Sequence, residues 1–539
     1  MTLVCVPIMV ESVEAALSDA QLAKDTGADI VELRIDSFFH GSAGDSPEDQ
    51  DQDRFVVEQL RGLVADCPLP VILTCRSAAE GGDYDGDEVD RVSLLEKLCV
   101  NTDHPPAYLD FELASYQKSA NIRQKINLCV DHPKQQRDVR TRLILSMHDF
   151  EGRPSDLMRR LADAWAEPAA SVVKFAYRAR SIRDNLEIFE ILREAPKPTI
   201  GLGMGEFGLM SRVLAPKFGG YLTFASLRQS AGTAPGQPTM SDLLGMYRFW
   251  SIGKDTKVYG VIGWPVTQSM SPLVHNAGFE ARGWDGVYLP MPVADSHESF
   301  KATLFELLDS AVFSGASVTI PHKARLATLA ASECWAVSRS VDAAGAGNTL
   351  VVGDPCLVTS TDGQGVSGSL AALLGSIEGR HAVLVGTGGV SASIAATLLR
   401  KDAAVTVTSR EFGRAEDFAG RLGCNAAQDP VGTPADVFIN CTPVGMAGGP
   451  DPDGLSIPIH DLAGKLPPET VFFDTVYNPI ETPMIRAARE HGFRTIDGVE
   501  MFIRQAAAQF ELWTGEKAPV QLFDRLVRER LSSTDAGGG

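Results

Sequence analysis

The chain has 539 residues, a net charge of −20 and ordinary fractions of hydrophobic and charged residues, 44% and 22%. A length above about 300 residues predicts two or three domains, and the negative charge argues against a nucleic-acid partner. No apolar run approaches the roughly 18 residues of a membrane helix and the first residues are strand-like, so we expect no membrane partner and no signal or transit peptide. The nine scattered cysteines form no C-x-x-C pair, which predicts a reducing compartment, most simply the cytoplasm, and neither disulfides nor a structural metal site.

The first half contains short apolar runs that alternate with amphipathic helical patterns. Eight buried strands that alternate with helices over about 240 residues predict an α/β fold of the (β/α)8 TIM-barrel type. An open parallel sheet is the alternative. The runs are Leu3–Met9, Ala28–Asp36, Pro70–Arg76, Ala107–Leu113, Arg142–Phe150, Ser171–Tyr177, Pro198–Gly205 and Tyr221–Leu227.

Polar residues near the ends of these runs favour the barrel. Barrel enzymes carry their chemistry at the C-terminal ends of the strands. Each residue alone has a structural explanation, such as a solvated ion pair or a strand cap, but at least five strand ends would direct charge at one mouth. The residues are Glu32, Arg34, Asp36, Arg76, Glu80, His148, Lys174, Arg212 and Gln237.

Lys174 is unusual because it lies in the middle of the apolar run "SVVKFAY". Burying an ammonium costs several kcal/mol unless it is paired or neutralised. A lysine that extends along the surface to reach water is the structural alternative to a catalytic amine.

The second half starts after a predicted helix, "MSDLLGMYRFWSIG", and a linker, "KDTK". The run "HAVLVGTGGVSASIAATLL" followed by "AAVTVTSR" predicts a strand, a glycine turn, a helix and a second strand, as in dinucleotide-binding units. Gly386, Gly388 and Gly389 would let the backbone approach a pyrophosphate, while Ser391 replaces the third glycine of the longer motif. Arg410 and Arg414 after the second strand favour NADP over NAD, although Glu411 lies between them and two exposed arginines also fit a solvated face.

Longer motifs resemble two enzyme families joined end to end. Residues 1–250 resemble type I 3-dehydroquinate dehydratase through "ELRID", "TCRSAAEGG", "SMHDF", "VVKFA", "SRVLAPKFGGYLTFAS" and "APGQ". Residues 257–539 resemble shikimate dehydrogenase through "GWPVTQSMSPLVHN", "SVTIPHK", "GAGNTL", "TDGQG", "VGTGGVS", "INCTPVGM", "DTVYNP" and "GVEMFIRQAAAQFELWTG". The resemblance implies a substrate-binding part, 257–362 with about 500–530, and a Rossmann NADP-binding part, 363–499.

For the first half, the resemblance implies dehydration of 3-dehydroquinate to 3-dehydroshikimate through a Schiff base on Lys174. His148 matches the general base, and Glu80 a carboxylate beside it. Burial and nearby cations are expected to favour the neutral, nucleophilic amine. Arg212 matches the partner of the substrate carboxylate, and Thr233 stands where the family commonly has serine. The remaining substrate-binding matches are Glu32, Arg34, Arg76 and Gln237.

For the second half, the resemblance implies reduction of 3-dehydroshikimate to shikimate with NADPH, with Lys323 and Asp362 as the catalytic pair. Ser317 and Ser360 replace family asparagines, and each replacement is expected to weaken substrate contacts by about 0.5 to 1.5 kcal/mol. Implied substrate-binding residues are Ser269, Ser271, Thr319, Asn348, Tyr477 and Gln505. Implied cofactor-binding residues are Gly386, Gly388, Gly389, Ser409, Arg410, Arg414 and Thr442.

Two alternatives remain. The second half could prefer quinate, which the retention of Ser269, Ser271 and Thr319 argues against. The chain could also be a metabolite-sensing regulator that binds pathway intermediates without converting them. Such regulators tend to lose catalytic residues, whereas Lys174, His148, Lys323 and Asp362 are all present here. The sequence leaves the oligomeric state open.

Overall fold

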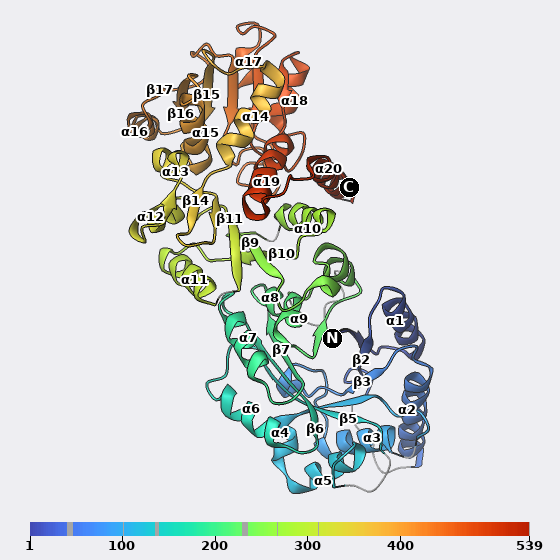
Figure 1. Cartoon of the computed structure of the whole chain (residues 1–539). Coiled ribbons are helices and arrows are strands. Elements are labelled where there is room, and N and C mark those ends of the chain that lie inside the picture. Colours follow the sequence, from blue (N-terminus) through green and yellow to red (C-terminus); the bar gives the residue numbers. More distant parts are fainter. Residues whose placement is uncertain are drawn as a thin grey trace. The chain divides into compact units, whose positions relative to one another are not determined.

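The computed structural model describes residues 1–39, 47–100, 102–134, 139–228, 236–266, 268–310 and 312–537. The chain divides into two compact units, Met1–Thr256 and Lys257–Gly539 (Figure 1). Across the described residues, no helix combines the length and the apolar character that crossing a bilayer requires. None of the nine cysteines, all of which lie in the part of the chain that the structure describes, forms a disulfide.

The first unit is a nearly closed barrel of eight parallel strands. The strand order is β7-β6-β5-β4-β3-β2-β1-β8, and the backbone N–H of Tyr221 donates to the Thr199 carbonyl at 2.9 Å, which links the starts of β8 and β7. The prediction of a barrel is therefore confirmed, and each predicted run overlaps a strand. The strands are β1 (Leu3–Met9), β2 (Ile30–Arg34), β3 (Val71–Thr74), β4 (Tyr108–Glu112), β5 (Arg142–Asp149), β6 (Ala170–Arg178), β7 (Thr199–Met204) and β8 (Leu222–Phe224).

Helices surround these strands (Figure 1). Local sequence sets several of their starts. For example, the Ser12 side chain accepts from the Ala15 backbone N–H at the start of α1, and Asp87 caps α3 in the same way. The helices are α1 (Val13–Asp25), α2 (Pro47–Asp66), α3 (Glu88–Cys99), α4 (Leu113–Lys118), α5 (Ala120–Cys129), α6 (Leu157–Ala166), α7 (Asp184–Glu194), α8 (Leu209–Val213) and α9 (Ala215–Phe218).

The predicted helix before the linker is wrong in type. It forms a π-helical turn, Asp242–Met246, and a short 3-10 turn, Phe249–Ser251. Arg248 between them has φ 52°, in the left-handed region, so the backbone cannot continue as one α-helix there.

The barrel interior explains how a polar site forms on buried strands. Successive side chains of a strand point to opposite faces, so every second residue faces inward. Near the N-terminal ends these inward residues are apolar and pack as one cluster that includes Ile30, Ile72, Tyr108, Ile144 and Val172. Two residues further along the same strands, the inward positions hold a hydrogen-bonded polar layer: Glu32, Thr74, Asp110, Ser146 and Lys174.

The second unit contains two six-stranded sheets. The first has the order β10-β9-β11-β13-β14-β12, in which only the pairs of β13 with β11 and with β14 are antiparallel. Its strands are β9 (Lys257–Gly263), β10 (Gly286–Pro292), β11 (Phe313–Val318), β12 (Ala336–Val337), β13 (Thr349–Val351) and β14 (Leu357–Thr359). Its chain segment also contains α10 (Ser271–Arg282), α11 (His297–Asp309), α12 (Lys323–Ser332) and α13 (Arg339–Ala344).

The other sheet is fully parallel, with the order β17-β16-β15-β18-β19-β20 that is typical of Rossmann folds. One face packs on α14, α15 and α16, and the other on α17 and α18. The strands are β15 (His381–Val385), β16 (Ala404–Thr408), β17 (Asn425–Ala427), β18 (Val437–Asn440), β19 (Val471–Asp474) and β20 (Arg494–Ile496). The helices are α14 (Asp362–Leu374), α15 (Gly389–Leu399), α16 (Phe412–Leu422), α17 (Ile459–Leu462) and α18 (Pro483–Glu490).

After this sheet the chain returns to the first sheet of the unit through α19 (Gly498–Thr514) and α20 (Val520–Gly537). Phe502, Phe510 and Phe523 from these helices share a core with Tyr259 and Phe279. The two sheets are thus tied together by the C-terminal helices as well as by α14.

The contact of α14 with α15 predicts opposite effects for two glycine substitutions. A Cβ at Gly363 would lie 2.0 Å from Thr397 Oγ1 and 2.5 Å from the Ser393 carbonyl oxygen, whereas a Cβ at Gly368 finds its nearest neighbour at 3.4 Å. Gly363→Ala should therefore destabilise the second unit by about 1 to 3 kcal/mol. Gly368→Ala should stabilise it by about 0.5 to 1 kcal/mol, because alanine favours a helix interior.

Calorimetry measures this difference as the shift of the second unit's unfolding transition, with the barrel's transition as an internal reference. Equal midpoints for the two variants would contradict the packing argument.

Candidate active sites

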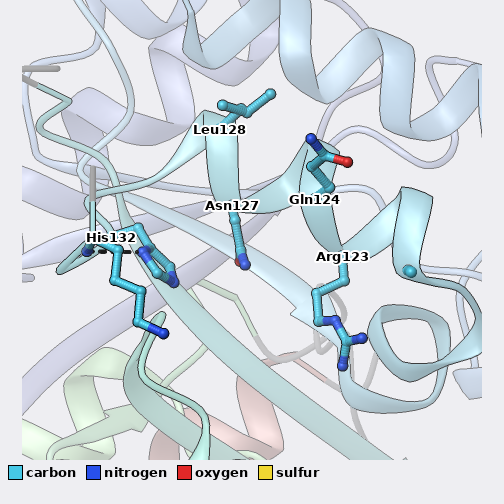
Figure 2. Close-up of a pocket in the computed structure, with 7 residues that line it drawn as sticks. Arg123, Gln124, Asn127, Leu128 and His132 are labelled. Atoms are coloured by element: carbon cyan, nitrogen blue, oxygen red, sulfur yellow. Dashed lines mark hydrogen bonds between the residues drawn. The ribbon is translucent and has the colours of Figure 1, made fainter. Parts of the chain in front are cut away.

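A surface pocket of the first unit holds none of the predicted site residues. It lies on α5 and the segment after it, and most of its polar side chains are exposed (Figure 2). Its lining residues are Ala120, Arg123, Gln124, Asn127, Leu128, His132 and Lys134.

The predicted residues of the first half instead meet at the mouth of the barrel, in a cavity that opens to solvent. Thr233 lies outside the described residues. Apolar side chains, among them Phe150, Met204 and Phe224, form the remaining wall. The predicted residues that line the cavity are Glu32, Arg34, Arg76, Glu80, His148, Lys174, Arg212 and Gln237.

Lys174 lies inside the barrel with 5% of its surface exposed, so it is not a lysine that extends to the surface. Its Nζ donates to Glu32 Oε1 at 3.2 Å and to Asp110 Oδ2 at 3.1 Å. It also lies 4.6 Å from the centre of the Phe224 ring, within the range of a cation–π contact. The two carboxylates stabilise the ammonium form and therefore oppose the cations that we expected to favour the neutral amine.

His148 and Glu80 form a close pair at the same mouth. Glu80 Oε2 lies 3.0 Å from His148 Nδ1 and accepts the His148 backbone N–H at 2.9 Å. Burial, assisted by Arg76 and Lys174, holds the pKa of His148 well below its usual range. A neutral His148 that donates from Nδ1 to an ionised Glu80 keeps Nε2 as a free base.

The arginines of the cavity differ in how they are paired. Arg34 is held by Asp36 at 2.7 Å, and Arg76 by Asp110 at 2.9 Å and Glu112 at 3.4 Å. Arg212 is 2% exposed, and its Nε has no hydrogen-bond partner among the described residues. Burial lowers the pKa of Arg212 to about 10, which leaves a cation suited to an incoming carboxylate.

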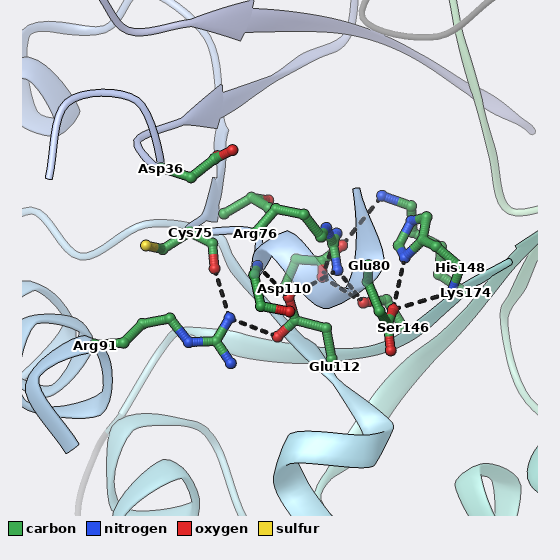
Figure 3. A network of polar contacts seen from close by, with 12 residues as sticks. Asp36, Cys75, Arg76, Glu80, Arg91, Asp110, Glu112, Ser146, His148 and Lys174 are labelled. Carbon is green, nitrogen blue, oxygen red and sulfur yellow. Dashed lines mark hydrogen bonds and ion pairs between the residues drawn. The ribbon is translucent and has the colours of Figure 1, made fainter. Parts of the chain in front are cut away.

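The sequence analysis missed the buried residues beneath this cavity (Figure 3). Asp110 and Ser146 contact each other at 2.6 Å, and Arg91 donates to Glu112 at 2.7 Å. The sequence contained a signal, because "YLDFE" places two carboxylates at alternate positions of an apolar run, which directs both of them to the same face.

In the second unit, Lys323 Nζ donates to Asp362 Oδ2 at 2.6 Å; Asp362 is buried and Lys323 is partly buried. Asn348 donates to the other carboxylate oxygen at 2.8 Å and to Gln505 Oε1 at 3.2 Å. Lys323 and Asp362 are the first residues of α12 and α14, Asn348 immediately precedes β13, and Gln505 lies in α19. The structure therefore brings together four predicted residues that are far apart in sequence.

The other residues matched to the substrate site also lie near the first sheet of this unit. Ser269 Oγ accepts the Ser271 backbone N–H at 3.2 Å at the start of α10. A Cβ at Gly263, the last residue of β9, would lie 2.3 Å from Thr319 Cγ2, so this strand end and the Thr319 loop are in close contact. Tyr477 packs on the Phe502 ring of α19 with centroids 5.0 Å apart.

Ser317 and Ser360, which stand where the family has asparagine, both form side-chain hydrogen bonds. Ser317 accepts from the Tyr288 hydroxyl at 2.7 Å and donates to Gln509 Oε1 at 2.9 Å. Ser360 donates to Ser393 of α15 at 2.9 Å. Both hydroxyls are therefore part of the buried scaffold.

The glycine turn has the features of a dinucleotide site. Gly386 has φ +110°, and a Cβ there would lie 3.0 Å from Thr442 Cγ2. Nothing lies within 4 Å of a Cβ at Gly388, and a Cβ at Gly389 would be 3.5 Å from Lys323 Cβ. The start of α15 therefore lies against Lys323 with open space beside it.

The segment after β16 carries the arginines that were expected to favour NADP, whose 2′-phosphate is absent from NAD. Arg410 is exposed and Ser409 is partly buried. Arg414 and Glu411 form an ion pair at 2.9 Å, with both side chains two-thirds exposed. Glu411 thus partly neutralises Arg414, as its position in the sequence suggested.

These geometries define an enzyme with two separate sites, one on a barrel with a buried lysine and one beside a dinucleotide-type glycine turn. Family models agree with this division: type I 3-dehydroquinase matches residues 4–254, the shikimate dehydrogenase substrate binding domain matches 261–350, and the shikimate 5'-dehydrogenase C-terminal domain matches 498–528.

Relatives match nearly the whole chain. The chloroplastic bifunctional 3-dehydroquinate dehydratase/shikimate dehydrogenase of Arabidopsis thaliana is 34% identical, over 98% of this chain and 84% of that protein. A shikimate biosynthesis protein of Chlamydia pneumoniae is 28% identical over 90% of both chains. A Thermus thermophilus shikimate dehydrogenase structure with NADP(H) and shikimate is 28% identical, covering 51% of this chain and 99% of its own, with a TM-score of 0.45. The chain belongs to the bifunctional 3-dehydroquinate dehydratase/shikimate dehydrogenase family.

Glu80 predicts a pH dependence of barrel stability. Burial raises the pKa of Glu80 from 4.5 to about 7, although Arg76 opposes this. A raised folded-state pKa contributes stability that is fully present below about 4.5 and is lost as the pH rises through about 7. Glu80→Gln should therefore flatten the stability profile across this window and raise the free energy of unfolding above pH 7 by about 1 to 3 kcal/mol.

Denaturant unfolding of the barrel at pH 4.5, 6 and 7.5 checks this prediction. Glu187→Gln is the control, because Glu187 is a surface carboxylate paired with Arg153 and should leave the slope unchanged. A steeper profile for Glu80→Gln than for the unmodified protein would contradict the burial argument.

Proposed function

We propose that the first unit converts 3-dehydroquinate to 3-dehydroshikimate through an imine on Lys174, and that the second unit reduces 3-dehydroshikimate to shikimate with NADPH. The observation that carries the first assignment is a buried amine beside a histidine–carboxylate pair and a desolvated arginine, all lining one cavity. Family membership supports both activities.

In the first reaction, the neutral amine of Lys174 attacks the substrate ketone, and loss of water gives a protonated imine. The imine accepts the electrons of the neighbouring C–H bond when His148 Nε2 removes that proton. The resulting enamine expels the β-hydroxyl group, which leaves as water with a proton from His148. Hydrolysis of the product imine returns the free amine of Lys174. Glu80 keeps His148 oriented and in the required tautomer.

Arg212 is assigned to the substrate carboxylate because it is buried and cationic. Its Nε has no hydrogen-bond partner among the described residues. Arg34 and Arg76 are held by carboxylates and offer fixed donors to the hydroxyl groups of the substrate. Glu32 and Gln237 complete the proposed contacts, together with Thr233.

In the second reaction, Lys323 supplies a proton to the carbonyl oxygen, and Asp362 holds its ammonium. Asn348, fixed between Asp362 and Gln505, orients the substrate hydroxyls with Ser269, Ser271, Thr319 and Tyr477. NADPH, when bound, supplies the hydride. The left-handed Gly386, the open Gly388 and the N-terminus of α15 fit its pyrophosphate, and Thr442, Ser409, Arg410 and Arg414 would hold the rest.

We assign substrate binding to residues 257–362 with about 500–530, and cofactor binding to residues 363–499. The separation into two sheets and the return of α19 and α20 to the first sheet support this division. The cytoplasmic location expected from the free cysteines stays a prediction.

The direct experiment follows absorbance and product when the protein is incubated with 3-dehydroquinate and NADPH. Formation of shikimate supports both assignments, and its absence would overturn the bifunctional proposal. Comparing oxidation of shikimate and quinate with NADP in the same preparation tests the quinate alternative. Faster turnover of quinate would replace the assigned substrate of the second unit.

Two lysine substitutions should separate the activities. Lys174→Met should remove dehydratase activity and leave dehydrogenase activity unchanged, because the imine needs an amine at that position. Lys323→Met should lower dehydrogenase kcat by about 10² to 10⁴, the usual range for a lost acid–base group, and leave dehydratase activity intact. Separate assays of the two reactions measure both effects, and each variant serves as the folding control of the other. Loss of both activities in either variant would contradict independent sites.

Arg410 should contribute to selection of NADP. The exposed guanidinium of Arg410 has no ion pair among the described residues, whereas Arg414 is partly neutralised by Glu411. Arg410→Ala should raise the KM for NADPH about 10- to 100-fold, the value of a charge-assisted hydrogen bond, with little change in the KM for NADH. Steady-state kinetics with both cofactors tests this, with Arg414→Ala as the matched variant and a smaller expected effect. An equal rise in both KM values would argue against a contact with the 2′-phosphate.

A further inference from the structure

Asp110 occupies a position that the residues assigned so far do not explain. It is the third residue of β4, 2% exposed, and lies outside the lining of the cavity. Its side chain nevertheless reaches Lys174, at 3.1 Å from Nζ. Glu32, the other carboxylate at this ammonium, lines the cavity and is assigned to the substrate.

The carboxylate of Asp110 is held in one orientation (Figure 3). Oδ1 accepts from Arg76 Nη2 at 2.9 Å and from Ser146 Oγ at 2.6 Å. Ser146 is itself fixed, because it accepts from Arg76 Nη1 at 2.8 Å. With Oδ1 occupied twice, Oδ2 is left to face Lys174. Arg76 and Lys174 hold the pKa of Asp110 well below its usual range despite burial, so the group is an anion at neutral pH.

We propose that Asp110 is a positioning residue for Lys174 and the counterion of the protonated imine. This inference rests on the proposed imine mechanism. In that mechanism, the ammonium and the ketone together yield the iminium ion and water. One C–N bond forms, the carbonyl oxygen leaves as water, and the positive charge stays on nitrogen. Only the neutral amine, which must form transiently to attack, and the carbinolamine that the attack produces lack that charge.

A fixed anion 3.1 Å away therefore stabilises both the ammonium before attack and the iminium ion after it. It disfavours the neutral amine that forms between these two states. Its removal has two consequences of the same sign. The amine becomes neutral at lower pH, and the imine loses its proton at lower pH. The pH window in which a reducible iminium forms should then move to acid as a whole.

Asp110→Asn tests this, because it removes the charge and keeps the shape. The probe is 3-dehydroquinate with cyanoborohydride from pH 5 to 9, with the reduced adduct mapped to Lys174 and quantified by mass spectrometry. We expect both limbs of the adduct yield to shift to acid by about one to two pH units, the usual effect of one adjacent charge. Unshifted limbs in folded Asp110→Asn would overturn the proposal. The charged or titratable groups around Lys174 that could also contribute are Cys5, Glu32, Arg76, His148 and Arg212.

Asp36→Asn is the matched control. Asp36 is an equally buried carboxylate paired with Arg34, but it does not contact Lys174 in the described part of the chain. It should change the KM for 3-dehydroquinate through Arg34 and leave the pH window in place. The same shift in both variants would mean that the general loss of negative charge, and not Asp110, sets the window.

Ser146→Ala keeps the charge and loosens Oδ1, so it tests positioning even if Asp110→Asn does not fold. We expect an unshifted pH window and a rate of adduct formation lowered about 10- to 100-fold, the value of a hydrogen bond to a charged group. An unchanged rate would remove the positioning role. Dehydrogenase activity of each variant normalises protein concentration. In the unmodified protein, absence of an adduct at Lys174 would overturn the imine mechanism itself, which separates that failure from a failure of Asp110.

Discussion

The ion pairing of Lys174 inside the barrel is the constraint on which the first site depends. A buried ammonium costs several kcal/mol unless it is paired, so the fold must supply anions in the same layer of the barrel as Lys174, above the apolar core. Strand alternation does this: Glu32 and Asp110 enter the barrel from two strands at the level of Lys174. These anions in turn need cations, and Arg76 provides one at 2.9 Å from Asp110. The charged side chains of the polar layer therefore depend on one another, and removing one of them leaves another charge buried and without its partner.

The barrel and the polar layer differ in how far the sequence predicts them. The eight strands follow from apolar runs, and polar residues near run ends such as Arg76 and His148 were expected to meet because strand ends meet at the barrel mouth. Lys174 lies within a run and was noticed because a buried ammonium is costly, whereas Asp110 and Ser146, which also lie within runs, were missed. Their function depends on which strands are neighbours, since Asp110 on β4 reaches Lys174 on β6 across β5. Such cross-barrel distances are absent from local patterns. The helix before the linker failed for a local reason, the left-handed Arg248.

Lys323 of the second unit is partly buried and is stabilised by a different arrangement of charges. Lys323 and Asp362 are the first residues of α12 and α14, so each lies where the helix dipole presents partial positive charge. That field favours the Asp362 carboxylate and opposes the Lys323 ammonium. The ion pair at 2.6 Å compensates for the opposition, and Asn348 fixes the second carboxylate oxygen.

This arrangement fits the proposed proton donor, whereas the barrel fits a lysine nitrogen that is positively charged before and after imine formation. Lys174 has carboxylates on two sides, so its nitrogen keeps a negatively charged partner through imine formation. Lys323 has one carboxylate partner and lies at the N-terminus of a helix, where the dipole opposes its charge. Because α15 begins against Lys323, a cofactor on the glycine turn would lie beside the proposed proton donor. Hydride and proton would then reach the carbonyl group from neighbouring elements, and the close contact of α14 with α15 at Gly363 keeps those elements in register.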